Sequence, residues 1–419
     1  MTKLEALEKY FGHTSFRPAQ ETVIDALLSG RDVLGVMPTG AGKSVCFQIP
    51  ALLLPGVTIV ISPLISLMKD QVAQLRQGDI PAAFINSSLT AEQYREVLRR
   101  VAIGRYKIIY VAPERLGTAD FMRFALERDG SEVPISQLAV DEAHCVSQWG
   151  QDFRPSYLKI AEFINKLKNR PVIGAFTATA TRDVKNDIIR LLLLKEPVSL
   201  TTGFDRPNLY FGVEKPKNKS KRLLELIAER QGMCGVVYCA TRKAVDSVCA
   251  ELRRHGESAA RYHAGLEDVE RRVNQDDYIQ GKVSIMVATN AFGMGIDKPD
   301  VRYVIHYNMP KNLENYYQEA GRAGRDGNPS DCILLFSDDD IKTAEHLIQD
   351  SGRNEALCLK EQRHVHMQDV KRLDKMIRYC EVYGCLRFYI LGYFGEKQKG
   401  KCGNCSNCLK PGFWKRIFV

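Results

Sequence analysis

The chain has 419 residues, 45% of them hydrophobic and 26% charged, which is the composition of a globular protein with two or three domains. It excludes disordered, collagen-like and membrane-spanning classes, and the start MTKLEALEKYF lacks a signal-peptide core, so we expect a cytoplasmic protein that contacts no membrane. Most of the net charge of +9 lies from Lys371 onward, with 11 Lys and Arg against 3 Asp and Glu, which indicates a polyanion partner such as nucleic acid or, alternatively, a solvated basic tail.

The first elements in chain order are short β-branched runs that alternate with helix-period segments. They are DVLGVM, TIVISP, KIIYVAP, QLAVDEAH and VIGAFTAT, and this rhythm is typical of a parallel sheet with crossover helices. The pattern stops near TTGFDRPNLYFGV and resumes with CGVVYCAT, ESAARYHAG, KVSIMVATN, VRYVIHYN and DCILLFS. The sequence therefore predicts an α/β protein with two tandem parallel-sheet domains, 1–203 and 204–340, followed by a small helical, metal-binding subdomain, 341–410, and a tail, 411–419.

The segment VMPTGAGKS follows the first predicted strand and precedes a helix, which is the context that a phosphate-binding loop requires. Glycines let backbone N–H groups surround phosphate oxygens, the lysine reaches the β and γ phosphates, and the serine binds magnesium. A chance GKS in a turn is the alternative. The expected nucleotide-binding residues are Thr39, Gly40, Gly42, Lys43 and Ser44.

The segment AVDEAH ends another predicted strand about a hundred residues later, where a second nucleotide motif belongs. We expect Asp141 to hold magnesium together with Ser44, and Glu142 to orient or deprotonate the attacking water. Two acids at a strand end are a weak indication alone, but they become strong when paired with the loop at Lys43.

Two arginines, Arg322 and Arg325, lie three residues apart in YYQEAGRAGRDG. On a helix this spacing would place them on one face, from which they could reach a γ-phosphate across a cleft and act in hydrolysis. A surface helix with ion pairs is the alternative.

The cysteines of CGNCSNC, which are Cys402, Cys405 and Cys408, have the spacing of metal ligands. Tetrahedral zinc needs a fourth ligand, and the upstream candidates are Cys380 and Cys385. An iron–sulfur cluster is the rival, but the bacterial ferredoxin run would require a cysteine at Gly412.

The motifs together resemble the RecQ family of superfamily-two DNA helicases, in family order and over nearly the whole chain. The matching segments are FRPAQ, MPTGAGKS, SPLISLMKDQV, APERL, DEAHCVSQWGQDFRP, TATAT, FDRPN, YHAGL, ATNAFGMGIDKPDVR and YYQEAGRAGRDG. The resemblance implies two RecA-like domains that bind ATP and a helical zinc-binding subdomain. It also implies that Cys385 is the fourth zinc ligand, and that Arg17 and Gln20 recognise adenine.

In this family the segment after DEAH is an aromatic-rich loop that touches single-stranded DNA and communicates with the ATP site. Aromatic rings suit this task because a base stacked on one gains about 1 to 3 kcal/mol whatever its sequence. The alternative is that the aromatic side chains simply fill the core. The residues that the resemblance implies for DNA binding and coupling are His144, Gln148, Trp149, Phe153 and Arg154.

The function implied is that of an ATP-dependent 3′–5′ DNA helicase with Mg²⁺ and Zn²⁺, acting on single-stranded and tailed duplex DNA in repair or recombination at the nucleoid. The chain ends at LKPGFWKRIFV, where many relatives continue into a winged-helix domain and a further helical domain, and we expect it to be truncated. The alternative function is a DNA-stimulated ATPase that binds or anneals DNA with little unwinding. An RNA helicase is disfavoured by the aromatic loop and the cysteine cluster.

Overall fold

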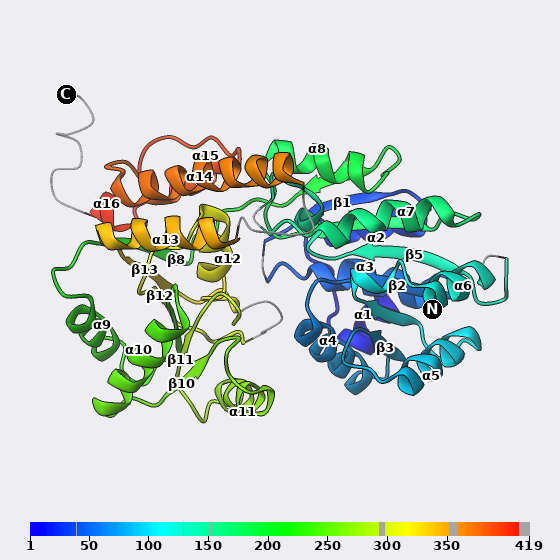
Figure 1. Cartoon of the computed structure of the whole chain (residues 1–419), viewed down its shortest axis with the longest axis horizontal. Helices are drawn as coiled ribbons and strands as arrows, with labels where there is room; N and C mark the ends of the chain where they lie inside the picture. The colour runs from blue at the N-terminus through cyan, green and yellow to red at the C-terminus, as the bar shows by residue number, and fades with distance from the viewer. Residues whose placement is uncertain (39, 129, 151, 293–297, 352–357, 410–419) are drawn as a thin grey trace. The chain divides into compact units, whose positions relative to one another are not determined.

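The computed structural model covers the whole chain and describes residues 1–419 except 39, 129, 151, 293–297, 352–357 and 410–419. Thr39, expected above in the phosphate loop, and the tail 411–419 lie outside the described residues. The chain divides into two compact units, Met1–Gly203 and a second that begins at Phe204. Each unit contains a parallel sheet with helices packed against it, which confirms the predicted α/β class (Figure 1).

Unit 1 is built on a seven-stranded parallel sheet in the order β3-β4-β2-β5-β6-β1-β7. Its strands are β1 (Val33–Val36), β2 (Val57–Ile61), β3 (Ala82–Ile85), β4 (Ile108–Val111), β5 (Ile135–Val140), β6 (Val172–Thr177) and β7 (Val198–Thr201). Its helices are α1 (Lys3–Phe11), α2 (Gln20–Leu28), α3 (Lys43–Leu53), α4 (Ile65–Gln77), α5 (Ala91–Ala102), α6 (Ala119–Glu127), α7 (Lys159–Lys166) and α8 (Arg182–Leu191).

The central strands of unit 1 are buried along their whole length, as parallel strands covered on both faces must be. Their apolar runs are therefore continuous rather than alternating, and this made them recognisable in the sequence. The edge strand β7 has no fully buried residue and β3 has only four residues, so neither produced a clear pattern. Both were missed.

Unit 2 holds a six-stranded parallel sheet in the order β10-β11-β9-β12-β13-β8. Its strands are β8 (Leu209–Glu214), β9 (Gly235–Tyr238), β10 (Ala259–Tyr262), β11 (Ile285–Ala288), β12 (Tyr303–His306) and β13 (Ser330–Leu335). Its helices are α9 (Lys219–Ala228), α10 (Arg242–Arg254), α11 (Asp268–Ile279), α12 (Leu313–Ala320), α13 (Asp338–Ser351), α14 (Leu359–Glu381), α15 (Leu386–Tyr393) and α16 (Ser406–Leu409). The six strands follow the same order in space as the first six strands of unit 1, so the two units share one topology.

The C-terminal helices pack on unit 2 through aromatic side chains and main-chain contacts. Tyr379 of α14 hydrogen-bonds Tyr316 of α12, with 3.1 Å between the two hydroxyl oxygens. Phe394, just after α15, stacks on Phe204 with ring centroids 4.6 Å apart. Figure 1 shows α14 and α15 on the same side of unit 2 as α12 and α13. No helix within the described ranges combines the length and apolar character that crossing a membrane needs.

Asp32, immediately before β1, ties together the chain segments that flank the first sheet. Its buried carboxylate accepts hydrogen bonds from the Arg170 guanidinium at 2.5 and 3.1 Å and from the backbone N–H groups of Ile173 and Lys195 at 2.9 and 2.7 Å. A buried carboxylate with this many donors is stable, but its removal leaves those donors unsatisfied.

We therefore expect Asp32→Ala to destabilise unit 1 by about 3 to 5 kcal/mol, which is on the order of 10 °C in melting temperature. The control is Asp120→Ala, which removes an exposed ion pair to Arg123 and should change the melting temperature little. Thermal unfolding followed by circular dichroism measures both. Equal melting temperatures for the two variants would show that the buried hydrogen bonds of Asp32 do not stabilise unit 1.

Candidate functional site

The phosphate-binding loop of unit 1 follows β1 and leads into α3, so that Lys43 is the first residue of that helix. Gly40 and Gly42 have φ angles of 81° and 79°, in the left-handed region that glycine adopts without strain. A Cβ atom on Gly42 would meet the Gln20 amide nitrogen at 2.3 Å, so only glycine fits there. A helix N-terminus preceded by a turned, glycine-rich backbone is the local geometry that suits an anion.

Arg17 and Gln20 both hold this loop from outside. The Gln20 amide nitrogen donates to the carbonyls of Gly42 and Ala41 at 3.1 and 3.4 Å, while its oxygen accepts from the Arg17 backbone N–H at 2.8 Å. The Arg17 guanidinium donates to the Gly40 carbonyl. Every polar atom of the Gln20 side chain is thus engaged within the protein, and the two residues act here as supports of the loop.

The acidic pair lies at the end of β5, beside the phosphate loop. Lys43 Nζ is 3.7 Å from Glu142 Oε1, and the Glu142 backbone N–H donates to Asp141 at 2.9 Å. Burial raises the pKa of Asp141 to about 6, with a further contribution from the negative charge of Glu142, and Lys43 partly offsets both. Glu142 has a φ of 46°, a left-handed conformation that is costly for glutamate and is found most often at functional sites.

His144 connects this acidic pair to the end of β6. Its Nδ1 lies 2.8 Å from the Thr177 hydroxyl and 3.3 Å from Glu142 Oε2. The Thr177 hydroxyl donates its own proton to the Thr179 carbonyl at 3.1 Å, so Nδ1 of His144 must carry the proton of the ring. Burial lowers the pKa of His144, which keeps the imidazole neutral at physiological pH. His144 is therefore a buried residue that connects Glu142 to Thr177, and its side chain is not exposed to DNA.

The aromatic loop after His144 combines one exposed ring with anchored neighbours. Trp149 has 39% of its surface exposed, Gln148 and Phe153 are half-buried, and the Trp149 backbone N–H donates to the Ser147 hydroxyl at 3.1 Å. Arg154 donates to the Pro63 carbonyl at 2.8 Å and pairs with Asp152 at 2.9 Å. Trp149 is thus the exposed aromatic ring of the loop, and Arg154 holds the loop to the segment after β2.

Two residues that the sequence reasoning did not single out complete the attachment of this loop. Tyr157, in the short 3-10 helix Pro155–Leu158, donates its hydroxyl to the Asp141 carbonyl at 3.0 Å. Asp187 of α8 accepts from the Ser147 hydroxyl at 2.7 Å. Neither has a motif to mark it, because both act through contacts that exist only in the folded chain.

The arginines Arg322 and Arg325 do not lie on a helix, and the expectation of a shared helical face is wrong. Helix α12 ends at Ala320, and residues 321–326 form consecutive turns in which Gly324 has a φ of 55°. The glycine-rich sequence GRAGRDG breaks the helix because glycine is a poor helix former and permits left-handed turns. Arg322 is buried and Arg325 half-buried on these turns.

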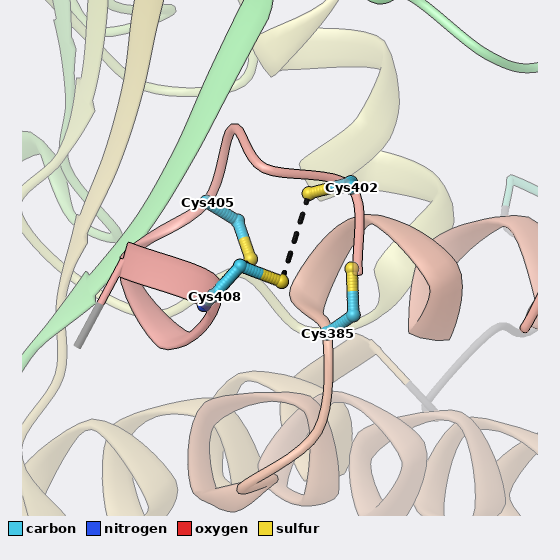
Figure 2. A group of neighbouring side chains, drawn as sticks. All are labelled: Cys385, Cys402, Cys405 and Cys408. Atoms are coloured by element: carbon cyan, nitrogen blue, oxygen red, sulfur yellow. Dashed lines mark hydrogen bonds between the residues drawn. The ribbon is translucent and has the colours of Figure 1, made fainter. Parts of the chain in front are cut away.

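The four cysteines Cys385, Cys402, Cys405 and Cys408 come together at the C-terminal end of unit 2 (Figure 2). Their sulfurs all lie within 4.8 Å of one another, and those of Cys402 and Cys408 are 4.0 Å apart. Backbone N–H groups donate to two of these sulfurs, from Asn404 to Cys402 and from Cys408 to Cys405. Cys380 is also buried but belongs to α14 and is not part of the group.

This group fits zinc by its chemistry and its size. Tetrahedral zinc with Zn–S bonds of about 2.3 Å separates its sulfurs by about 3.8 Å, close to the spacing observed here. A hydrogen bond from Cys385 lowers the pKa of Cys405, and the same contact raises the pKa of Cys385, as expected of thiols crowded into one site. All four ligands would hold one ion in a closed, structural site.

Three family models match the chain in succession. They are a DEAD/DEAH box helicase model over residues 17–187, a helicase conserved C-terminal domain over residues 218–327, and a RecQ zinc-binding model over residues 338–409. The first covers the phosphate loop and the acidic pair, the second covers the arginines, and the third covers the cysteine group.

Curated relatives match over most of the chain. It is 46% identical over 403 residues to the ATP-dependent DNA helicase RecQ of Bacillus subtilis, covering 96% of this chain and 66% of that protein. It is 41% identical to the RecQ helicase of Haemophilus influenzae, covering 98% and 64%, and 43% identical to the probable ATP-dependent DNA helicase RecS of Bacillus subtilis, covering 83% and 70%. The chain spans just under two thirds of the two RecQ relatives.

Solved structures share the fold at low sequence identity. A crystal structure of the DUF1998 helicase MrfA bound to DNA matches with a TM-score of 0.68 at 18% identity, over 84% of this chain and 54% of that one. Dbp5 of Saccharomyces cerevisiae bound to RNA and ADP BeF3 matches with a TM-score of 0.64 at 18% identity, over 89% and 97%. These likenesses confirm the expected pair of RecA-like domains.

The cysteine group predicts one zinc ion per chain. We expect Cys385→Ser to lose it and Cys380→Ser to retain it, because only the first removes one of the four clustered sulfurs. Metal analysis of the purified proteins by mass spectrometry checks both variants. Retention of zinc by Cys385→Ser, or iron with sulfide in the unsubstituted protein, would contradict the assignment.

Proposed function

The chain belongs to the RecQ family of DNA helicases, and we propose that it is an ATP-dependent motor that translocates 3′ to 5′ on single-stranded DNA and unwinds duplex DNA. The observation that carries the proposal is the junction between two sites in unit 1. An acidic pair beside a phosphate loop continues directly, through His144 and Tyr157, into a loop with an exposed tryptophan. Such a junction lets DNA contact and nucleotide hydrolysis depend on each other.

Each group beside the phosphate loop has a distinct part in this proposal. The loop N–H groups and Lys43 bind the phosphates of ATP, and Ser44 and Asp141 hold magnesium, which neutralises charge on the phosphates when bound. The pKa of Asp141 is raised mainly by burial and further by the negative charge of Glu142, and a cation bound there would favour the ionised carboxylate. Glu142 is well placed to orient the attacking water once Lys43 turns from it to the phosphates.

The arginines and Gln20 have supporting parts. Arg322 and Arg325 stabilise the negative charge that develops on the transferred phosphate, which is the usual contribution of a guanidinium in this chemistry. Arg17 and Gln20 hold the phosphate loop, and recognition of adenine by Gln20 requires its amide to leave the carbonyls of Ala41 and Gly42.

In this proposal, DNA binding is coupled to ATP hydrolysis through the hydrogen bonds of the aromatic loop. A base stacked on Trp149 shifts a loop whose Ser147 is fixed to α8 and whose Arg154 is fixed to Pro63. The same loop begins at His144, which contacts Glu142 and Thr177. Movement of the loop is therefore felt at Glu142, and we infer that Gln148 and Phe153 add further DNA contact. The expected setting is chromosomal repair or recombination in the cytoplasm.

Trp149→Ala should keep the basal ATPase rate and lose most of its stimulation by single-stranded DNA, because the stacking contact of about 1 to 3 kcal/mol is removed. The matched control is Leu126→Ala, which removes another exposed apolar side chain of unit 1, on α6, and should leave stimulation unchanged. ATP hydrolysis with and without a DNA oligonucleotide measures the ratio. Full stimulation of Trp149→Ala would rule out the coupling role of the loop.

The function itself is tested by strand separation of a duplex with a 3′ single-stranded tail, run beside DNA-stimulated ATP hydrolysis on the same preparation. We expect unwinding with the 3′ tail, little with a 5′ tail, and neither unwinding nor hydrolysis by Lys43→Ala. Hydrolysis without unwinding would favour the alternative, a DNA-stimulated ATPase that binds or anneals strands. Hydrolysis retained in Lys43→Ala would refute the phosphate-loop assignment.

A further inference from the structure

Residues 204–209, which lead into β8, the first strand of unit 2, hold the turns that carry Arg322 and Arg325. We call residues 321–327 the arginine turn. Arg206 donates to three carbonyls of that turn, to Gly321 at 3.2 Å, to Ala323 at 3.1 Å and to Gly324 at 2.8 Å. One guanidinium therefore holds the peptide group that precedes Arg322, the peptide group that precedes Arg325, and the one between Ala323 and Gly324.

Asn208 packs against the same turn. Its amide nitrogen donates to the Gly324 carbonyl at 2.9 Å and to the Asn328 carbonyl at 3.0 Å. A Cβ atom on Gly324 would lie 2.5 Å from this amide, so the turn and the segment are in close contact. Arg206 and Asn208 together leave the arginine turn little freedom on this side.

The opposite side of residues 204–209 is held by the cysteine region. Arg387, two residues after Cys385, is buried and donates to Asp205 at 2.7 Å, to the Arg206 carbonyl at 2.6 Å and to the Leu209 carbonyl. Its five donors allow one side chain to span several acceptors. The segment is thus anchored by the residue that follows a metal ligand.

A second anchor comes from between two other cysteines of the group. Asn404, which lies between Cys402 and Cys405, donates to the carbonyls of Pro207 and Leu209, each at 3.1 Å. The Ser406 hydroxyl accepts from the Val213 backbone N–H on β8 at 3.3 Å. The metal-binding loop therefore hydrogen-bonds the main chain of residues 204–209, and these contacts do not depend on the side chains of that segment.

We propose that residues 204–209 connect the zinc loop to the arginine turn, and that Arg206 is a positioning residue that sets Arg322 and Arg325 for ATP hydrolysis. The inference rests on the proposed function, because it gives those two arginines their task. It goes beyond that function by making the zinc loop a determinant of the hydrolysis rate and by assigning a positioning role to Arg206 of the FDRPN segment.

The physical reason is that a charged side chain acts on a transition state only when it is held in place. A displacement of about 1 Å far from the reacting atoms can lower a rate about 100-fold. The start of the arginine turn is hydrogen-bonded back to α12, but the amides of Gly324 and Asp326 bond to Val301 and Pro299 instead. The position of the turn therefore depends on contacts from neighbouring segments. Oxidation or loss of the cysteine ligands would release the zinc loop and, through the same contacts, slow hydrolysis.

The first test measures the turn directly by hydrogen exchange and needs no enzymatic activity. The amides of Gly321, Arg322, Ala323 and Gly324 are protected by hydrogen bonds to Tyr317, Glu319, Ala320 and Val301. We expect Arg206→Ala to speed exchange in the peptide 321–327 about tenfold, with exchange in α10 unchanged and one zinc retained per chain. Unchanged exchange in 321–327 would overturn the proposal.

Asn404→Ala gives the test from the zinc side, since it keeps all four cysteines and removes only the contacts to Pro207 and Leu209. We expect faster exchange in 321–327 here too, and no further increase in the double variant Arg206→Ala/Asn404→Ala, because both changes act on one path. Fully additive effects, or no effect of Asn404→Ala, would show that the zinc loop and the turn are independent.

The second test is kinetic, with single-stranded DNA at saturation. Arg206→Ala should lower kcat about 10- to 100-fold and leave KM for ATP and DNA affinity within about twofold. Arg230→Ala is the control, because Arg230 also bridges elements of unit 2, from α9 to Asp331, but contacts neither the turn nor the cysteine region. Equal losses in the two variants would overturn the role of Arg206.

A wild-type chain without ATPase activity would refute the proposed function. The exchange results would still decide whether residues 204–209 connect the zinc loop to the arginine turn.

Discussion

Main-chain pairing of β6 between β5 and β1 is the interaction on which the site depends. The parallel register sets Val36 opposite Thr177 and Val140 opposite Ala175, so the three strands end at one edge of the sheet. Ligand sites in open α/β sheets form at the carboxyl ends of strands for this reason. The phosphate loop, the acidic pair and the threonine that binds His144 follow those three strand ends. Segments more than a hundred residues apart in sequence meet there.

The same topology serves a different purpose in unit 2. There β8 takes the place of β1, and Lys219 opens α9 as Lys43 opens α3. Lys219 Nζ, however, lies 2.6 Å from the buried Asp340 and donates to the Tyr307 carbonyl at 2.9 Å. The lysine that we propose to bind phosphate in unit 1 is thus matched in unit 2 by a lysine that forms an internal ion pair. The carboxyl edge of the first sheet carries the proposed nucleotide site. At the corresponding edge of the second sheet, the Lys219–Asp340 ion pair holds α13.

Buried polar contacts of this protein are concentrated where segments of different elements must be held in a fixed relation. Asp32 is hydrogen-bonded to chain segments next to β1. Arg154 joins the aromatic loop to the chain after β2, and Arg387 joins the cysteine region to the start of unit 2. Each uses a charged group whose donors or acceptors are matched by several partners, which offsets the cost of removing it from water. Apolar packing holds each sheet to its own helices, and these charged groups determine how the functional loops attach to them.

The sequence by itself predicted the α/β class, the tandem sheets, the phosphate loop, the acidic pair and three clustered cysteines, because each depends on local spacing or on the apolar pattern of a buried strand. The spacing left Cys380 and Cys385 as alternatives for the fourth ligand, and the fold brings Cys385 to the group. The sequence could not determine where Arg322 and Arg325 lie, since a spacing of three residues between arginines suits a helix and a turn equally and the glycines decide between them. Nor could it show that Gln20 holds the phosphate loop, that Tyr157 supports Asp141 or that Arg206 holds the arginine turn. Those contacts join residues that are distant in sequence, and only the tertiary packing of the elements brings their atoms within hydrogen-bonding distance.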